Sequence, residues 1–354
     1  MSNFYKFYRP FLFLFSPELA HSLSIFVLKY GLLRFGRKNT HPILNTKVWN
    51  LSFPTPIGLA AGYDKNAEVP EEILKLGFGF TEVGTITPKA QPGNLKPRIF
   101  RLIKDNGVIN RLGFNNGGLG PAKKRLNKIN ERGRRGIVGA NVGANKTSDD
   151  RIEDYIIGLE ALEGLADYYV INISSPNTPG LRALQSKKSL EDLLGKTIKA
   201  RDGFKSWAPL LLKVAPDLTE EDIKDISEVA MDKKIDGLII ANTTILRPES
   251  LTSQERCQSG GLSGRPLFEL STKTLRSFYK STMGKIPLIG VGGVEDGETA
   301  YKKIKSGASL VQIYSSLVYE GPNLAIKISN QLDALLIKDG YKSVAEAIGA
   351  DVKY

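Results

Sequence analysis

Residues 209–244 read PLLLKVAPDLTEEDIKDISEVAMDKKIDGLIIANTT. Two short apolar runs, 209–216 and 237–244, flank an acidic segment with helical spacing at 219–234. Near-continuous apolar runs of this length are typical of parallel strands that other elements cover on both faces. A strand, a helix and a second strand in this order predict one βαβ unit of an α/β protein.

The same pattern recurs along most of the chain. Six further apolar runs are PIGLAAG (56–62), FTEVGTIT (80–87), GIVGANVG (136–143), YYVINISS (168–175), PLIGVGG (287–293) and LVQIYSS (310–316). Helical segments such as EDYIIGLEALEG (153–164) lie between them. Eight strand–helix units predict a (β/α)8 TIM barrel. The alternative is a doubly wound sheet, which would need a topological switch point and usually has fewer strands.

The chain carries 49 Lys and Arg against 37 Asp and Glu, so its formal net charge is +12. This excess indicates an acidic partner, such as nucleic acid, an anionic membrane surface or a small anion. The basic residues are scattered and do not alternate with aromatic side chains, so we expect no nucleic acid. Cys257 is the single cysteine, and His21 and His41 are the only histidines. A disulfide framework, a zinc site and a histidine triad are therefore excluded, and no metal is expected.

The N-terminal stretch 4–34, FYKFYRPFLFLFSPELAHSLSIFVLKYGLLR, is apolar but has no uninterrupted run near the ~18 residues of a membrane span. Arg9-Pro10 interrupts its first part, and Ser16-Pro17-Glu18 interrupts its middle. Ser16 suits an N-cap, with Pro17 at the first helical position. The stretch predicts two short helices, neither of which can cross a bilayer.

Apolar residues recur at helical spacing along the second of these helices and form one face of it. They are Leu19, Leu23, Phe26, Val27, Tyr30 and Leu33. One interpretation is a helical hairpin that covers the core of a soluble domain. The run Phe11–Phe15 favours the other, a peripheral membrane segment, because soluble proteins rarely expose such a patch. We expect an amphipathic helical segment at 1–44 and a barrel at 45–354. With no signal or transit pattern, the cytoplasmic side of a bacterial inner membrane is favoured over the mitochondrial inner membrane.

Polar residues follow nearly every predicted strand. In (β/α)8 barrels the C-terminal strand ends form the functional mouth. Each residue alone could be a cap or a turn residue, but together we expect them to converge on one site. They are Asp64-Lys65, Thr85, Asn141, Asn172 with Ser175, Lys213, Asn242 with Thr243, Gly292-Gly293 and Tyr314-Ser315.

The last two strand ends, Gly292-Gly293 and Tyr314-Ser315, stand where such barrels commonly bind phosphate groups on backbone N–H groups. Gly261 and Gly264 could add a close backbone approach. The chain has no strand–GxGxxG–helix dinucleotide motif. A mononucleotide such as FMN therefore fits better than NAD.

Six stretches together resemble class 2 dihydroorotate dehydrogenases, the membrane-associated, quinone-linked type. They are GLAAGYDKN (58–66), PRIFRL (97–102), NRLGFNN (110–116), NISSPNTPGLR (172–182), GGLSGRP (260–266) and IGVGGV (289–294). The resemblance implies oxidation of dihydroorotate to orotate in pyrimidine (UMP) synthesis, with FMN and then a membrane quinone as acceptors. Alternatives are another FMN-dependent barrel oxidoreductase, or a non-catalytic phosphate-binding protein of the membrane surface.

The resemblance also implies a role for each matching position. Ser175 would be the catalytic base, where the soluble class has Cys, and His21 and Arg101 would contact the quinone. Substrate would be held by Lys65, Asn110, Arg111, Leu112, Gly113, Phe114, Asn172, Asn177, Asn242 and Thr243. FMN would be held by Ala61, Gly62, Thr85, Asn141, Asn172, Lys213, Ala241, Gly264, Gly293, Tyr314 and Ser315. Two positions depart from the family pattern, because Tyr63 replaces a smaller apolar residue and Ala241 replaces Thr.

The chemistry of the substrate agrees with these residue types. Orotate is a flat ring edged by carbonyls and N–H groups, and asparagine amides offer both donors and acceptors to match it. Its carboxylate needs a cation, for which Lys65 is the candidate, while Lys213 suits the flavin ring. Ser175 would take the C5 proton of dihydroorotate while C6 gives a hydride to the flavin.

Overall fold

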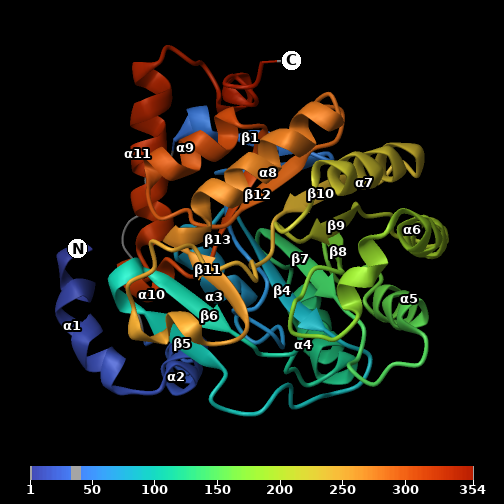
Figure 1. Ribbon diagram of the computed structural model, residues 1–354, viewed down its shortest axis with the longest axis horizontal. Coiled ribbons are helices and arrows are strands. Elements are labelled where there is room, and N and C mark those ends of the chain that lie inside the picture. Colours follow the sequence, from blue (N-terminus) through green and yellow to red (C-terminus); the bar gives the residue numbers. More distant parts are fainter. Residues whose placement is uncertain (1, 33–40, 354) are drawn as a thin grey trace.

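The computed structural model describes residues 2–32 and 41–353 of the chain. Within these residues, eight parallel strands close into a barrel surrounded by helices (Figure 1), which confirms the predicted (β/α)8 fold. In spatial order the strands are β10 (Gly237–Ile240), β12 (Leu288–Val291), β13 (Ala308–Ile313), β3 (Ile57–Leu59), β4 (Phe80–Ile86), β7 (Ile137–Val142), β8 (Tyr168–Asn172) and β9 (Leu210–Val214).

The helices alternate with the strands, as the βαβ pattern predicts. Some begin at a recognisable signal, such as Thr219 before α7, whose side chain and that of Asp222 form a capping box. The barrel helices are α3 (Pro70–Lys75), α4 (Leu119–Glu131), α5 (Arg151–Ala161), α6 (Lys187–Asp202), α7 (Glu220–Asp232), α8 (Phe268–Ser281), α9 (Gly297–Lys305), α10 (Leu317–Glu320) and α11 (Leu324–Lys338).

Aromatic rings fill the interior of the barrel at its N-terminal end. A hairpin of β1 (Thr46–Val48) and β2 (Leu51–Phe53) closes that end, and Phe53 packs edge-on against Phe80 at 5.4 Å. A Cβ on Gly58 would lie 2.3 Å from the Phe80 ring, so glycine is required there. Because this end is packed, ligands have access only at the C-terminal ends of the strands.

Two helices, α1 (Ser2–Leu14) and α2 (Pro17–Lys29), precede the barrel and lie beside its mouth (Figure 1). Ser16 caps α2 as predicted, accepting a hydrogen bond from the backbone N–H of Leu19. Pro10 lies inside α1, so Arg9-Pro10 interrupts the apolar run but does not end the helix. No helix in the described ranges is long and apolar enough to cross a bilayer. Leu33, predicted on the apolar face, lies outside the described residues.

A second, antiparallel sheet lies between these helices and the barrel (Figure 1), and the sequence did not predict it. Its strands are β5 (Ile99–Leu102), β6 (Gly107–Asn110) and β11 (Gly261–Gly264). The register pairs Asn110 with Ile99 on one side and with Gly261 on the other. The sheet therefore joins segments about 150 residues apart in the chain at the rim of the mouth.

Candidate active site

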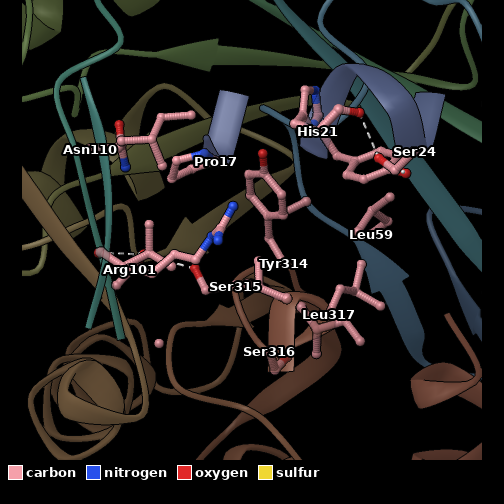
Figure 2. Close-up of a pocket in the computed structure, with 18 of the residues that line it drawn as sticks. Pro17, His21, Ser24, Leu59, Arg101, Asn110, Tyr314, Ser315, Ser316 and Leu317 are labelled. Carbon is pink, nitrogen blue, oxygen red and sulfur yellow. Dashed lines mark hydrogen bonds between the residues drawn. The ribbon is translucent and has the colours of Figure 1, made fainter. Parts of the chain in front are cut away.

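One cavity of about 610 Å³ runs from the N-terminal helices to the barrel mouth. Its outer part is lined by apolar side chains of α1 and α2, among them Phe11, Phe13 and Leu23. At the inner end of the cavity, polar side chains of the N-terminal helices and of the barrel mouth point toward one another (Figure 2). Of the predicted site residues, the cavity is lined by His21, Ala61, Arg101, Asn110, Leu112, Lys213, Ala241, Asn242, Thr243, Gly264, Gly293, Tyr314 and Ser315.

Amide side chains form a connected network at the ends of β4, β7 and β8. Asn172 donates to the hydroxyl of Thr85 at 3.0 Å, and Thr85 donates to Asn141 at 2.6 Å. Asn141 in turn donates to the buried carboxylate of Glu82 at 2.7 Å. Each buried polar group is therefore fixed by its neighbour, which makes the strand ends a rigid, oriented surface.

Asn172 and Asn242 are joined through Ser174. The hydroxyl of Ser174 donates to Asn172 Oδ1 at 2.8 Å and accepts from Asn242 Nδ2 at 2.9 Å. The Asn242 carbonyl oxygen also accepts from the backbone N–H of Thr243 at 2.8 Å. Asn172, at the end of β8, and Asn242, just after β10, are thus joined by one hydroxyl that the sequence did not single out.

The predicted base, Ser175, lies beside a second pair of amides. Its Oγ accepts from the backbone N–H of Asn177 at 3.3 Å. The Asn177 amide donates to the backbone carbonyl of Asn110 at 3.2 Å, which joins the loop after β8 to β6. Ser175 is buried in the loop that follows β8, and the backbone N–H of Asn177 in the same loop orients its hydroxyl.

The segment after Asn110 has side chains that point in several directions. Arg111 donates to Gln258 and Ser259 and lies 4.5 Å above the ring of Phe100, away from the mouth. Gly113 has a left-handed φ of 69° and its carbonyl accepts from Gln91. Phe114 packs against the barrel core. Among these, only Asn110 and Leu112 line the large cavity.

The two predicted lysines occupy different environments. Lys213 is buried inside the mouth, and burial lowers its pKa while Glu82 opposes the shift. Lys65 lines a second, polar cavity together with Glu18 and Asn66, and burial lowers the pKa of Lys65 to about 8. His21 and Tyr63 line both cavities, so they separate the apolar cavity from the polar one.

Glycines and hydroxyls shape the mouth near β12 and β13. A Cβ on Gly293 would lie 2.5 Å from the backbone of Phe268, so no larger residue fits. Ser315 shares a hydrogen bond of 2.8 Å with Ser263, and the Tyr314 hydroxyl donates to the carbonyl of Gly62 at 3.1 Å. Ser316 Oγ is buried without a partner among the described residues. This arrangement suits an oxygen-rich ligand group.

The predicted quinone residues lie where the helices meet the mouth (Figure 2). Arg101 donates to the carbonyls of Phe13 and Phe15, so it also holds the end of α1. Burial, with the charge of Lys65, lowers the pKa of His21 to about 3. His21 is therefore neutral over the physiological pH range, as suits a residue that faces an apolar ligand.

The sequence did not predict several residues of the site. Glu82 lies within a predicted strand and looked like an ordinary interior position, although its carboxylate receives hydrogen bonds from Asn141, Tyr168 and Gln312. Ser263 belongs to a glycine-rich stretch that gave no strand signal. A charged residue inside an apolar strand is the one signal that could have identified Glu82.

A (β/α)8 barrel with an amide-lined mouth, a buried lysine and a glycine cradle at its last two strands defines a cofactor-dependent barrel enzyme. A family profile described as "Dihydroorotate dehydrogenase" matches residues 43–336. This chain belongs to the dihydroorotate dehydrogenase family, and its relatives place it in the quinone-linked class 2, a class of flavoprotein oxidoreductases.

The relatives match over nearly the full length. A dihydroorotate dehydrogenase (quinone) of Azorhizobium caulinodans is 52% identical over 99% of this chain and 100% of its own. That of Brucella anthropi is 51% identical over 98% and 95%. A crystal structure of the Eimeria tenella enzyme in complex with ferulenol superimposes with a TM-score of 0.92 at 43% identity, covering 95% of both chains. Fold and family are thus confirmed by sequence and by structure.

Proposed function

We propose that this protein oxidises dihydroorotate to orotate in pyrimidine (UMP) synthesis, with FMN as hydride acceptor and a membrane quinone as final acceptor. The observation that carries the proposal is the single cavity that joins exposed apolar helices to an amide-lined barrel mouth. A lipophilic acceptor can enter from the helices while a polar substrate meets the amides. The two halves of the reaction would then take place at the two ends of one site.

The residues at the mouth fit FMN. Its phosphate would lie on the glycine cradle of Gly264, Gly293 and Ser315, and its ring beside Lys213 and the amides. Further contacts would come from Ala61, Gly62, Thr85, Asn141, Asn172, Ala241 and Tyr314. Bound FMN supplies a ring that accepts a hydride and passes electrons to the quinone. Ser316 Oγ and Gln312 Oε1, which are buried without a partner in the described chain, would offer the cofactor additional polar contacts.

Substrate would be held between the network of Asn172 and Asn242 and the pair of Asn110 and Asn177. Lys65 would bind the carboxylate, and the segment Arg111–Phe114 and Thr243 would complete the wall. Ser175 would take the C5 proton, because it follows Asn172 closely in the chain and its hydroxyl lies beside Asn177, from whose backbone N–H it accepts a hydrogen bond. A serine hydroxyl is a weak base, so it would have to pass its own proton on to an acceptor as it takes the C5 proton, in a site from which bulk water is excluded.

The quinone would enter through the segment 1–44, and the barrel of 45–354 would hold the other ligands. Leu19, Phe26 and Phe11 are 48%, 52% and 60% exposed, so the apolar face of α2 and the adjacent end of α1 point outward. Such a face suits insertion among lipid headgroups, and Lys and Arg suit an anionic membrane surface. His21 and Arg101 would contact the quinone head. The protein would be peripheral on the cytoplasmic side of an inner membrane.

One experiment tests the cofactor and the reaction together. The purified protein should be yellow, and the flavin released by denaturation should comigrate with FMN rather than riboflavin or FAD. Dihydroorotate added without oxygen should bleach the colour, and a long-tailed quinone should restore it. A colourless protein, or a flavin that dihydroorotate does not reduce, would refute the proposal. The latter result would favour another FMN-dependent barrel enzyme or a non-catalytic membrane-surface protein.

A further inference from the structure

Lys303 is a buried charged residue that the proposed reaction does not use. It lies on α9 and is fully buried behind the strand β12. Its ammonium donates to the hydroxyl of Ser271 at 2.7 Å and lies 5.1 Å from the centre of the Phe268 ring. Burial lowers the pKa of Lys303 well below its ordinary value, and the exposed Glu269 only partly opposes this. A buried ammonium without a carboxylate partner costs free energy, and an anionic group nearby would offset that cost.

Ser271 connects Lys303 to the glycine cradle. The Ser271 hydroxyl lies 3.0 Å from the carbonyl oxygen of Gly292 and 3.1 Å from that of Phe268, so it can donate to either. The hydroxyl oxygen accepts from Lys303 at the same time. A donor that itself accepts from a cation is a stronger donor, because hydrogen bonds in a chain polarise one another.

The Gly292 carbonyl belongs to the same peptide unit as the N–H of Gly293. Both glycines line the large cavity, whereas Lys303 lies behind them. The backbone N–H groups of Gly293 and Ser315 have no acceptor within the described part of the chain. A hydrogen bond on the Gly292 carbonyl makes the Gly293 N–H a better donor toward the cavity.

On the side away from the cavity, packing against the start of α8 makes the Gly292–Gly293 peptide unit immobile. A Cβ on Gly292 would lie 2.8 Å from Ser271 Oγ, and one on Gly293 would lie 2.5 Å from Phe268. Both glycines also have positive φ values, of 106° and 76°, which other residues rarely adopt. The start of α8 is therefore in direct contact with the cradle, and no intervening layer separates it from Lys303.

We propose that Lys303 is a positioning residue for the phosphate of FMN, acting through Ser271 on the Gly292–Gly293 peptide and placing a positive charge behind the cradle. The inference rests on the proposed FMN-dependent function. The competing role, in which Lys303 only fills space in the core, predicts that replacing Lys303 leaves the preference for FMN over riboflavin unchanged. A test should therefore compare a ligand that carries the phosphate group with one that lacks it.

The test compares FMN with riboflavin, which has the same ring but no phosphate. Full-length wild type and Lys303→Met, both freed of flavin, are titrated with each ligand while flavin fluorescence is followed. Methionine keeps the length of the side chain and removes the charge. We expect the dissociation constant for FMN to rise about tenfold and that for riboflavin to stay the same, since a buried charge acts over several ångströms.

Two further variants complete the design. Ser271→Ala keeps Lys303 but removes the hydroxyl that connects it to the Gly292 carbonyl. This variant should weaken the binding of FMN, and not that of riboflavin, by about threefold. Lys302→Met removes an exposed lysine of the same helix and should change neither affinity. Equal weakening of both flavins, or an unchanged ratio of the two affinities, would overturn the inference.

These titrations distinguish a failure of the inference about Lys303 from a failure of the proposed FMN-dependent function. If Lys303→Met does not fold, an unchanged affinity ratio in Ser271→Ala overturns the inference by itself. A wild type that binds neither flavin refutes the proposed cofactor, and the inference with it. A wild type that prefers FMN, with the same preference in both variants, refutes only the role of Lys303.

Discussion

The hydroxyl of Tyr63 donates a hydrogen bond to the hydroxyl of Ser24 over 2.9 Å, which joins the end of a barrel strand to α2. Ser24 in turn donates to the carbonyl of His21 at 2.7 Å (Figure 2). The Tyr63 ring also stands edge-on to His21 at 5.1 Å and to Tyr314 at 6.0 Å. Tyr63 thus lies between the expected quinone and flavin contacts.

Replacing Tyr63 by Phe should slow the reaction with quinone alone. The substitution keeps the ring contacts and removes one hydrogen bond, worth about 0.5–1.5 kcal/mol. We expect kcat/KM for a long-tailed quinone to fall about three- to tenfold, with unchanged flavin reduction in stopped-flow experiments. Ser24→Ala should have the same effect, and the double variant no greater one. An equal loss in both half-reactions would place Tyr63 on the substrate side.

Replacing Ser175 by Ala should separate binding from proton transfer. The variant should retain FMN and bind orotate, because the amides around Ser175 bond to one another without it. Flavin reduction by dihydroorotate should slow by about 10²–10⁴-fold, the usual contribution of a general base. Stopped-flow bleaching measures this rate, and orotate titration is the control. Bleaching at the wild-type rate would remove Ser175 from the role of base.

Lys65→Ala should weaken orotate binding by about ten- to a hundredfold, the loss of one charge-assisted hydrogen bond. The pKa of Lys65 is about 8, so its ammonium is present below pH 8 and is lost as pH rises through that value. Orotate affinity of the wild type should therefore fall above pH 8, and the variant should lack this slope. Titrations between pH 6 and 9.5 test both points. An identical slope in the variant would assign the titration to another group.

His21 should make the fold more sensitive to acid. Its pKa in the folded protein is about 3, below the 6.5 of an unfolded histidine, so the unfolded state binds the proton first as pH falls. The stability from neutral His21 is complete above pH 6.5 and is lost progressively toward pH 3. The Tm advantage of wild type over His21→Asn should shrink between pH 7 and pH 4. A constant difference over this range would show that His21 does not titrate on unfolding.

The exposed apolar face should bind lipid. Changing Leu19 and Phe26 to Ser removes two side chains that are about half exposed and leaves the barrel untouched. We expect weaker sedimentation with vesicles containing anionic lipid and a higher KM for long-tailed quinones, with normal flavin reduction. Ile337→Ser on α11, which is also exposed but far along the chain, is the matched control. Unchanged vesicle binding would argue against the membrane contact.

The barrel was predictable because its strands are buried on both faces and therefore read as apolar runs. The predicted run 209–216, for example, contains the observed strand Leu210–Val214. The strand ends were also predictable, because parallel strands bring their C-terminal ends to one edge. Asn172, Asn242 and Thr85 are accordingly in one hydrogen-bonded network.

The orientation of α2 and the burial of Lys303 could not be predicted, because both depend on contacts between segments that are distant in the chain. The periodicity of α2 placed Leu19 and Phe26 on an apolar face, and both side chains are about half exposed, whereas the polar His21 and Ser24 line the cavity. Which side of α2 faces the barrel depends on contacts with distant segments, and the sequence alone does not show these contacts. Lys303 was missed because a lysine on an amphipathic helix is normally exposed. Its burial follows from the packing of α8 against α9, which no local pattern records.

The small sheet β11–β6–β5 has a consequence for cooperativity. It carries Arg101 at the helix side, Asn110 at the substrate amides and Gly264 at the phosphate cradle, all within one set of paired strands. The three proposed ligand sites thus share a single stiff element. Any ligand that displaces this sheet at one site must change the affinity at the others, and the coupling is reciprocal by thermodynamic linkage. A tight inhibitor in the apolar cavity would then be detectable as a change in how firmly the protein retains its flavin.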